Sequence, residues 1–175
     1  DTCSYFMRYN PKEKTWKETN RIKSPTGNLQ AQVVQISDEY LICYIRRGGN
    51  FLPTETGYAI RSESRDGGYT WSDGVDTPFK NPNSALDLIK LKSGNLLMVY
   101  NDNMNERTPL IVVISTDNDK TWAYSRDILG GDNTYAYPYA IQRSDGKIVI
   151  LYTTNARTTI MLSIFNESAI LESKW

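Results

Sequence analysis

Short apolar runs separated by polar turns recur along the whole chain and predict a protein built from β-strands. The runs are rich in β-branched and aromatic residues, and Gly, Asn, Asp or Ser residues bound them. These features are typical of short strands joined by hairpins. The most apolar runs cover residues 40–44, 96–100 and 148–152. No window sustains a 3.6-residue period with helix caps, so we expect an all-β fold.

The apolar runs belong to a longer repeat that the tryptophans mark. The four tryptophans stand at positions 16, 71, 122 and 175, with gaps of 55, 51 and 53 residues. Near-equal spacing of every copy of a rare residue indicates an internal repeat. A unit of about 50 residues with three or four antiparallel strands has the size of a propeller blade. The other strands expected in the three units are 32–36, 56–62, 87–91, 110–115, 139–143 and 159–165.

Two of the repeat units end in the same eight-residue turn. Residues 64–71 fit the pattern S-x-D-x-G-x-T-W at every fixed position, and residues 115–122 fit all but the glycine, where Asp119 stands. We expect Asp66 and Asp117 to accept hydrogen bonds from backbone N–H groups of the turn, with positive φ at the glycine position. Aspartate tolerates that φ better than most residues, so the second turn is expected to form. These aspartates are interpreted as structural, and each following tryptophan as packing between units.

The eight-residue turn resembles the Asp-box of the sialidase superfamily, also called the bacterial neuraminidase repeat. The resemblance covers essentially the whole chain and extends to Asn-Pro-Asn-Ser at 81–84 and Tyr-Ala-Tyr-Pro at 135–138. It implies a six-bladed β-propeller whose site lies on the axis, where the inner strands converge. About three blades would be present. The implied divisions are the end of a preceding blade (1–16), two blades (17–71 and 72–122) and a closing blade (123–175).

Three blades do not close a ring, and an open propeller leaves strand edges that favour association. The chain is therefore expected to be the C-terminal half of a larger propeller. Its expected partner is the missing half, as another chain, a fragment or a symmetry mate. The first residue is Asp1 rather than methionine, which predicts that a segment upstream has been removed.

The resemblance also implies a set of site residues. Sialidases hold a substrate carboxylate with three arginines, because a guanidinium fork matches a carboxylate and stays charged. They use a tyrosine nucleophile that a glutamate activates, with an aspartate as acid/base. Arg46 and Arg107 resemble the second and third arginines, Tyr137 the catalytic nucleophile, and Asn83 and Gln30 polar neighbours that bind substrate. The first arginine and the aspartate would lie in the missing half.

Two acidic positions of the family pattern are occupied by neutral residues. The stretch 24–37, where the activating glutamate belongs, holds no carboxylate, and Thr153 stands where a second glutamate follows the apolar strand of the last blade. A phenol with a pKa near 10 needs a base beside it to attack at neutral pH. Sialidase activity in the strict sense is therefore not expected. Two functions stay open: a glycoside hydrolase of unassigned sugar specificity, and a non-catalytic propeller that binds glycan or protein.

Structural interpretations compete with each of these assignments. An ordinary inter-blade or surface charge is as good an interpretation of Arg46 and Arg107 as a site role. Arg47 is an alternative to Arg46 as the arginine that points toward the propeller axis. Tyr137 is one of 12 tyrosines, so packing is nearly as good an interpretation as a site role. For Arg157, between the last two strands, a contact with a ligand at the rim is the less favoured interpretation.

Composition narrows the chemistry further. The absence of histidine excludes Ser-His-Asp catalysis and His-ligated zinc, but sialidase-type chemistry needs no histidine. Lys+Arg and Asp+Glu balance at 20 each, so nucleic acid is not an expected partner, and no apolar stretch predicts a membrane span. We expect no metal and no cofactor. Cys43 is expected to be buried, its pairing with Cys3 stays open, and an extracytoplasmic or secreted location is favoured.

Overall fold

The computed structural model describes residues 2–173, and it confirms the all-β prediction. Residues 1, 174 and 175, and with them Trp175 of the tryptophan repeat, lie outside the described residues. The described part of the chain consists of antiparallel sheets and one short helix, α1 (Ser168–Leu171). That single turn of helix is the one departure from the expectation of strands alone.

Each sheet is made of strands that are consecutive in the sequence. The N-terminal hairpin pairs β1 (Met7–Asn10) with β2 (Thr15–Glu18). The next sheet has the order β3 (Asn28–Gln35), β4 (Leu41–Arg47), β5 (Tyr58–Ser64) and β6 (Val75–Lys80). A second four-stranded sheet follows with β7 (Asp87–Lys90), β8 (Leu96–Asn101), β9 (Leu110–Ser115) and β10 (Tyr124–Leu129). The last sheet has three strands, β11 (Ala136–Gln142), β12 (Ile148–Thr154) and β13 (Thr159–Phe165).

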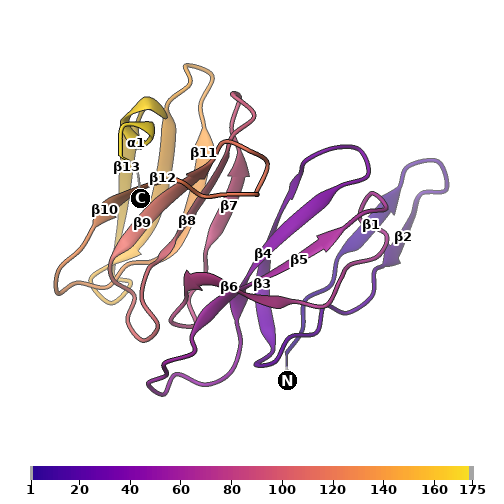
Figure 1. The fold of residues 1–175 in the computed structure, drawn as a ribbon, viewed down its shortest axis with the longest axis horizontal. Coiled ribbons are helices and arrows are strands. Elements are labelled where there is room, and N and C mark those ends of the chain that lie inside the picture. Colours follow the sequence, from indigo (N-terminus) through magenta and orange to yellow (C-terminus); the bar gives the residue numbers. More distant parts are fainter. Residues whose placement is uncertain (1, 174–175) are drawn as a thin grey trace.

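The sheets are arranged side by side in chain order, as the blades of a propeller are (Figure 1). The first strands of neighbouring sheets contact one another, β3 with β7 and β7 with β11. These three strands are therefore the inner strands of an arc of blades. The tryptophans do not mark the ends of the sheets. Trp71 and Trp122 each precede the fourth strand of a sheet, so a repeat counted from one tryptophan to the next ends one strand before its sheet does.

Apolar side chains fill the spaces between successive sheets. One core cluster joins the two four-stranded sheets and includes Ile42, Tyr100 and Val113, while Trp122 packs against it. A second cluster joins the last two sheets, with Leu97 and Tyr152 among its members. The alternation of side chains along each strand supplies both faces of a sheet to these layers. Stacking between blades is thus the main source of apolar burial in this fold.

The first Asp-box turn has the hydrogen bonds predicted from its sequence. The Asp66 carboxylate accepts hydrogen bonds from the Tyr69 and Thr70 N–H groups at 2.9 and 3.0 Å, and from the Thr70 hydroxyl at 2.6 Å. Gly68 takes a φ of 85°. Trp71 is buried and packs against Phe6, with ring centroids 4.6 Å apart. The structural interpretation of this motif is confirmed.

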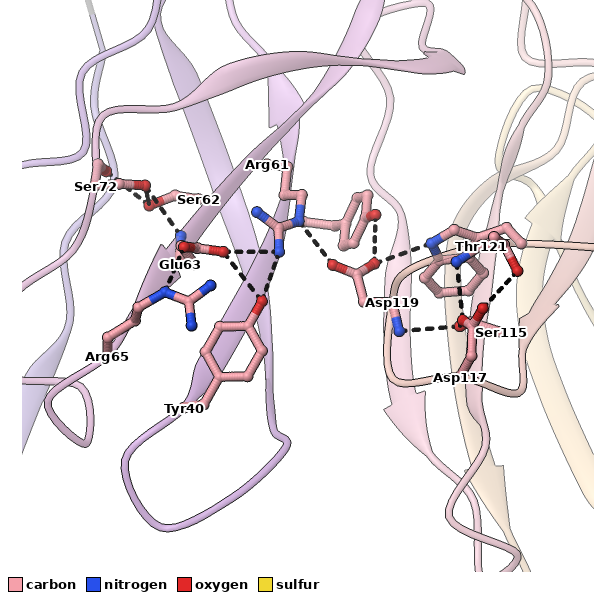
Figure 2. Close-up of polar contacts among 12 residues, drawn as sticks. Tyr40, Arg61, Ser62, Glu63, Arg65, Ser72, Ser115, Asp117, Asp119 and Thr121 are labelled. Carbon is pink, nitrogen blue, oxygen red and sulfur yellow. Dashed lines mark hydrogen bonds and ion pairs between the residues drawn. The ribbon is translucent and has the colours of Figure 1, made fainter.

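The second Asp-box turn carries Asp119 with a φ of 75°, so aspartate takes the left-handed position, as predicted. Its side chain also joins two blades, which the motif does not predict. The carboxylate accepts hydrogen bonds from Arg61 Nε at 2.7 Å, the Tyr44 hydroxyl at 2.7 Å and Trp122 Nε1 at 2.9 Å. Figure 2 shows Arg61 between this carboxylate and that of Glu63. An ion-pair network therefore ties the first four-stranded sheet to the turn of the second.

The two cysteines are separate in the structure. Cys43 is fully buried, as expected, and its burial raises the pKa of the thiol to about 12. Cys3 is exposed, and both thiols are free.

Candidate functional site

Three residues at equivalent places in successive blades share an unusual backbone conformation. Gln30, Asn83 and Tyr137 have φ values of 57°, 55° and 52°, and each lies at the start of an inner strand or just before it. Residues with side chains seldom adopt this left-handed region, and it often marks functional positions. The strand register shifts beside Gln30 and beside Tyr137, as in a β-bulge, which redirects side chains. The sequence predicted all three as site residues, and the structure gives them one common backbone feature.

Arg46 connects two of these three residues. It lies at the end of β4 with 7% of its surface exposed. Its Nε donates a hydrogen bond to Asn83 Oδ1 at 2.7 Å, and its Nη1 donates to Gln30 Oε1 at 2.8 Å. Burial lowers the pKa of Arg46, and the charge of Arg107 lowers it further. Within residues 2–173 no carboxylate forms an ion pair with Arg46, so both of these contacts are to neutral oxygens.

Arg47 and Arg46 are adjacent on β4, and the structure separates their surroundings. Arg47 Nε donates a hydrogen bond to the Asn81 carbonyl oxygen at 3.0 Å. Successive side chains of a strand point to opposite faces. The contacts with Asn83 and Gln30 belong to Arg46, which is therefore the residue that joins the predicted set.

Arg107 lies in the loop between β8 and β9 and reaches the same place. Its Nη2 donates a long hydrogen bond to the Asn83 carbonyl oxygen at 3.4 Å. Its guanidinium carbon lies 5.5 Å from the centroid of the Tyr137 ring, within the range of a cation–π contact. The Arg107 carbonyl oxygen accepts a hydrogen bond from the Tyr135 N–H at 2.8 Å. The loop is therefore tied to the start of β11, which carries Tyr137.

Tyr137 is surrounded by positive charge. The Arg107 guanidinium lowers the pKa of its phenol most, and the Arg157 guanidinium also lowers it. Partial burial opposes this effect, and the charge of Arg46 adds to it. Throughout the described part of the chain, no aspartate or glutamate hydrogen-bonds the phenol. The arrangement favours the phenolate form but supplies no base to accept the proton.

An open cavity of about 510 Å³ lies at the start of β11, the strand that carries Tyr137. Its lining residues come from four connecting segments and from the start of β11; they are Phe51, Arg107, Thr134, Ala136, Ala156 and Arg157. Thr153, which replaces the second family glutamate, donates a hydrogen bond from its hydroxyl to the Ala136 carbonyl oxygen at 3.1 Å. The replacement therefore stabilises the strand pairing near the cavity and adds no charge there.

Arg157, for which a ligand contact was the less favoured interpretation, lines this cavity. In the three larger sheets an arginine lies near the end of the second strand or after it: Arg46 is the next-to-last residue of β4, Arg107 follows β8 and Arg157 follows β12. The predicted residues Arg46, Arg107, Tyr137, Asn83 and Gln30 lie together, and Arg157 extends the cluster.

The described residues contain no group of three or more His, Cys, Asp or Glu side chains that are placed to hold a metal ion. Within the same residues, no helix has the length and apolar character needed to cross a bilayer.

The blade topology and the Asp-box turns define this chain as part of a sialidase-type β-propeller. The family model described as the BNR repeat-like domain matches residues 3–150. The chain therefore belongs to this family, within the sialidase superfamily. No curated protein matches its sequence.

Solved structures with the same fold include glycoside-processing enzymes. The intramolecular trans-sialidase of Ruminococcus gnavus is 21% identical with a TM-score of 0.76, over 95% of this chain and 38% of that one. The leech intramolecular trans-sialidase is 19% identical with a TM-score of 0.76, over 95% and 28%. The α-L-arabinanase of Penicillium chrysogenum is 17% identical with a TM-score of 0.58, over 79% and 46%. The chain thus has a scaffold that glycoside hydrolases use, and it spans less than half the length of each of these structures.

Proposed function

We propose that this chain contributes the sugar-binding part of a carbohydrate-active propeller site that acts as a glycoside hydrolase on an anionic sugar. The observation that carries the proposal is the buried Arg46, which has no ion pair within the described residues and lies with Arg107 near Tyr137. A buried charge normally has a partner of opposite sign. A carboxylate on the ligand would supply that partner for both arginines.

In this proposal each residue has a role set by its chemistry. Arg46 and Arg107 bind the carboxylate, and Asn83 and Gln30 hold the Arg46 guanidinium in place. The Tyr137 oxygen bonds to the anomeric carbon as the glycosidic C–O bond breaks, and water then releases the sugar. The acid that protonates the leaving group, and the base that accepts the phenol proton, would come from the rest of the propeller.

The absence of a carboxylate beside Tyr137 within the described residues favours a second candidate, a propeller that binds an anionic glycan without cleaving it. No aspartate or glutamate of the described residues hydrogen-bonds the phenol, and Arg46 hydrogen-bonds the amide oxygens of Asn83 and Gln30. The two candidates share the same pocket. They differ in whether the phenol attacks.

Hydrolysis of fluorogenic glycosides separates these candidates. We expect the assembled propeller to cleave an aryl glycoside of an acidic sugar such as glucuronate faster than an aryl galactoside, because only the acidic sugar carries a carboxylate. Tyr137→Phe is expected to lower kcat by about 10³-fold, in the range for loss of a catalytic group. Tyr139→Phe is the matched control, because Tyr139 lies on the same strand and is exposed. Binding without cleavage would establish the second candidate, and neither binding nor cleavage would contradict the proposal.

A further inference from the structure

The turn between β12 and β13 is held in a conformation that its residues do not favour. Asn155, Ala156 and Arg157 have φ values of 50°, 52° and 72° in succession, and none of them is glycine. A residue with a side chain pays about 1–2 kcal/mol to enter this region. Such a conformation persists only when the surroundings fix it, and it is common where a binding group must be presented.

Side-chain hydrogen bonds fix this turn against the segment that leads into β11. Asn133 Nδ2 donates to Asn155 Oδ1 at 2.9 Å, and the Asn155 N–H donates to Asn133 Oδ1 at 3.2 Å. Asn155 Nδ2 also donates to Thr159 Oγ1 at 3.2 Å. The turn that carries Arg157 is therefore tied to the strand that carries Tyr137.

The Arg157 side chain is directed to the cavity rather than to an acidic neighbour. It lines the cavity with Arg107, and its guanidinium lowers the pKa of the Tyr137 phenol. In the chain between residues 2 and 173, neither Arg157 nor Arg107 nor Arg46 forms an ion pair with a carboxylate. Three guanidinium groups from three consecutive blades thus face one phenol, and their mutual repulsion is relieved when an anion enters.

We propose that Arg157 is a further ligand-binding residue of this site, which acts with Arg107 to hold an anionic group of the glycan beside Tyr137. The proposal deepens the proposed function and rests on it for the ligand being a glycan. It assigns to this chain three cationic groups rather than the two that the family pattern predicts. The pocket consequently selects sugars that carry a carboxylate over neutral sugars of the same size.

Binding measured by titration calorimetry tests the role of Arg157 in the ligand complex. The probes are N-acetylneuraminate, glucuronate and, as the neutral sugar, galactose. Arg157→Gln is expected to weaken binding of the two acids about tenfold or more, the loss typical of a charge-assisted hydrogen bond. Arg157→Lys should restore part of that loss, while Arg143→Gln, an exposed arginine paired with Asp145, should bind as the unmodified chain does.

A titration without ligand tests the effect of Arg157 on Tyr137 separately. The phenol of Tyr137 is followed as the difference in ultraviolet absorbance between the unmodified chain and Tyr137→Phe. Arg157→Gln is expected to raise the pKa of Tyr137, because the guanidinium that stabilises the phenolate is gone. The control variant Arg143→Gln should leave the pKa of Tyr137 unchanged.

Each outcome decides between the two proposals. If Arg157→Gln binds the acids as tightly as the unmodified chain does while Arg46→Gln loses them, the role of Arg157 is overturned and the proposed function stands. An unchanged pKa of Tyr137 in Arg157→Gln would also overturn it. If the unmodified chain binds none of the acids, the proposed function fails and this proposal fails with it.

Discussion

At the scale of single residues, this protein uses left-handed backbone positions for two different purposes. In the Asp-box turns, Gly68 and Asp119 adopt positive φ to close a hairpin. At the inner strands, Gln30, Asn83 and Tyr137 adopt it at the places where side chains gather around the arginines. The positive φ in the Asp-box turns can be predicted from the motif, which contains a glycine. The second use has no sequence signature, because none of the three residues is a glycine.

The Asp-box aspartates are expected to make stability depend on acid pH. Hydrogen bonds from Thr70 to the Asp66 carboxylate lower its pKa well below the ordinary value, and those from Thr121 lower the pKa of Asp117. A lowered folded-state pKa gives stability that is present above the unfolded-state value of about 3.9 and is lost as the pH falls through the folded-state value. The unfolding free energy of the unmodified chain should therefore fall between about pH 5 and about pH 2.

The double variant Asp66→Asn, Asp117→Asn should show a shallower fall over the same pH range, because those two groups no longer titrate. Urea unfolding at several pH values measures this dependence. Asp76→Asn, at an exposed position on β6, is the control. An equal slope in the double variant and the unmodified chain would show that the two turns do not contribute to acid sensitivity.

At the scale of elements, the contact between the first two four-stranded sheets depends on an ion-pair network as well as on apolar packing. The Asp119 side chain is 2% exposed, and it pairs with Arg61 on β5. Although burial lowers the pKa of Arg61, its hydrogen bond and charge interaction with Asp119 raise it above the ordinary value. The position where the motif has glycine therefore carries an inter-blade contact.

Restoring the motif glycine is expected to destabilise this protein. Asp119→Gly removes backbone strain but leaves Arg61 and Tyr44 without their buried partner, and breaking a buried ion pair costs about 3 kcal/mol. Chemical denaturation gives the change in unfolding free energy. Asn118→Gly is the matched control, because Asn118 is exposed and also has positive φ, at 59°. It should be neutral or slightly stabilising, and a stabilised Asp119→Gly would refute the role given to the network.

The sequence predicts the elements better than it predicts their contacts. The apolar run at 148–152 lies within β12, because a strand that is buried on both faces forms a continuous apolar stretch between polar turns. The Arg46–Asn83 contact joins residues 37 apart, and no local pattern encodes such a pairing. The Asp119 network is hidden for the same reason. The left-handed conformation of the turn that carries Arg157 could not be predicted, because Asn155–Ala156–Arg157 contains no glycine.

At the scale of the whole molecule, the two ends of the arc of blades expose apolar side chains. On the last sheet, Tyr139, Ile160 and Leu162 are 59%, 73% and 49% exposed, and the N-terminal hairpin exposes Trp16 at 62%. Contiguous apolar surface of this kind marks an association site. We propose that these ends meet the missing half of the propeller, as another chain, a fragment or a second copy.

Association should be visible in solution. We expect the chain to associate, and the double variant Ile160→Lys, Leu162→Lys should lower the associated fraction because it places charge on the exposed face of β13. Light scattering coupled to size-exclusion chromatography gives the mass. Val75→Lys, at an exposed apolar position on another sheet, is the control. A stable monomer of 20.0 kDa in the unmodified chain would contradict the proposed association.

The proposed function requires that Arg46, Arg107 and Tyr137 form one site for an anionic sugar. The most direct test is an NMR titration of the chain with N-acetylneuraminate and with galactose, which follows the Tyr137 ring and the arginine Nε–H signals. We predict saturable shifts at Tyr137, Arg46 and Arg107 with the acid and none with galactose. Shifts confined to other residues, or equal shifts with the neutral sugar, would contradict the claim.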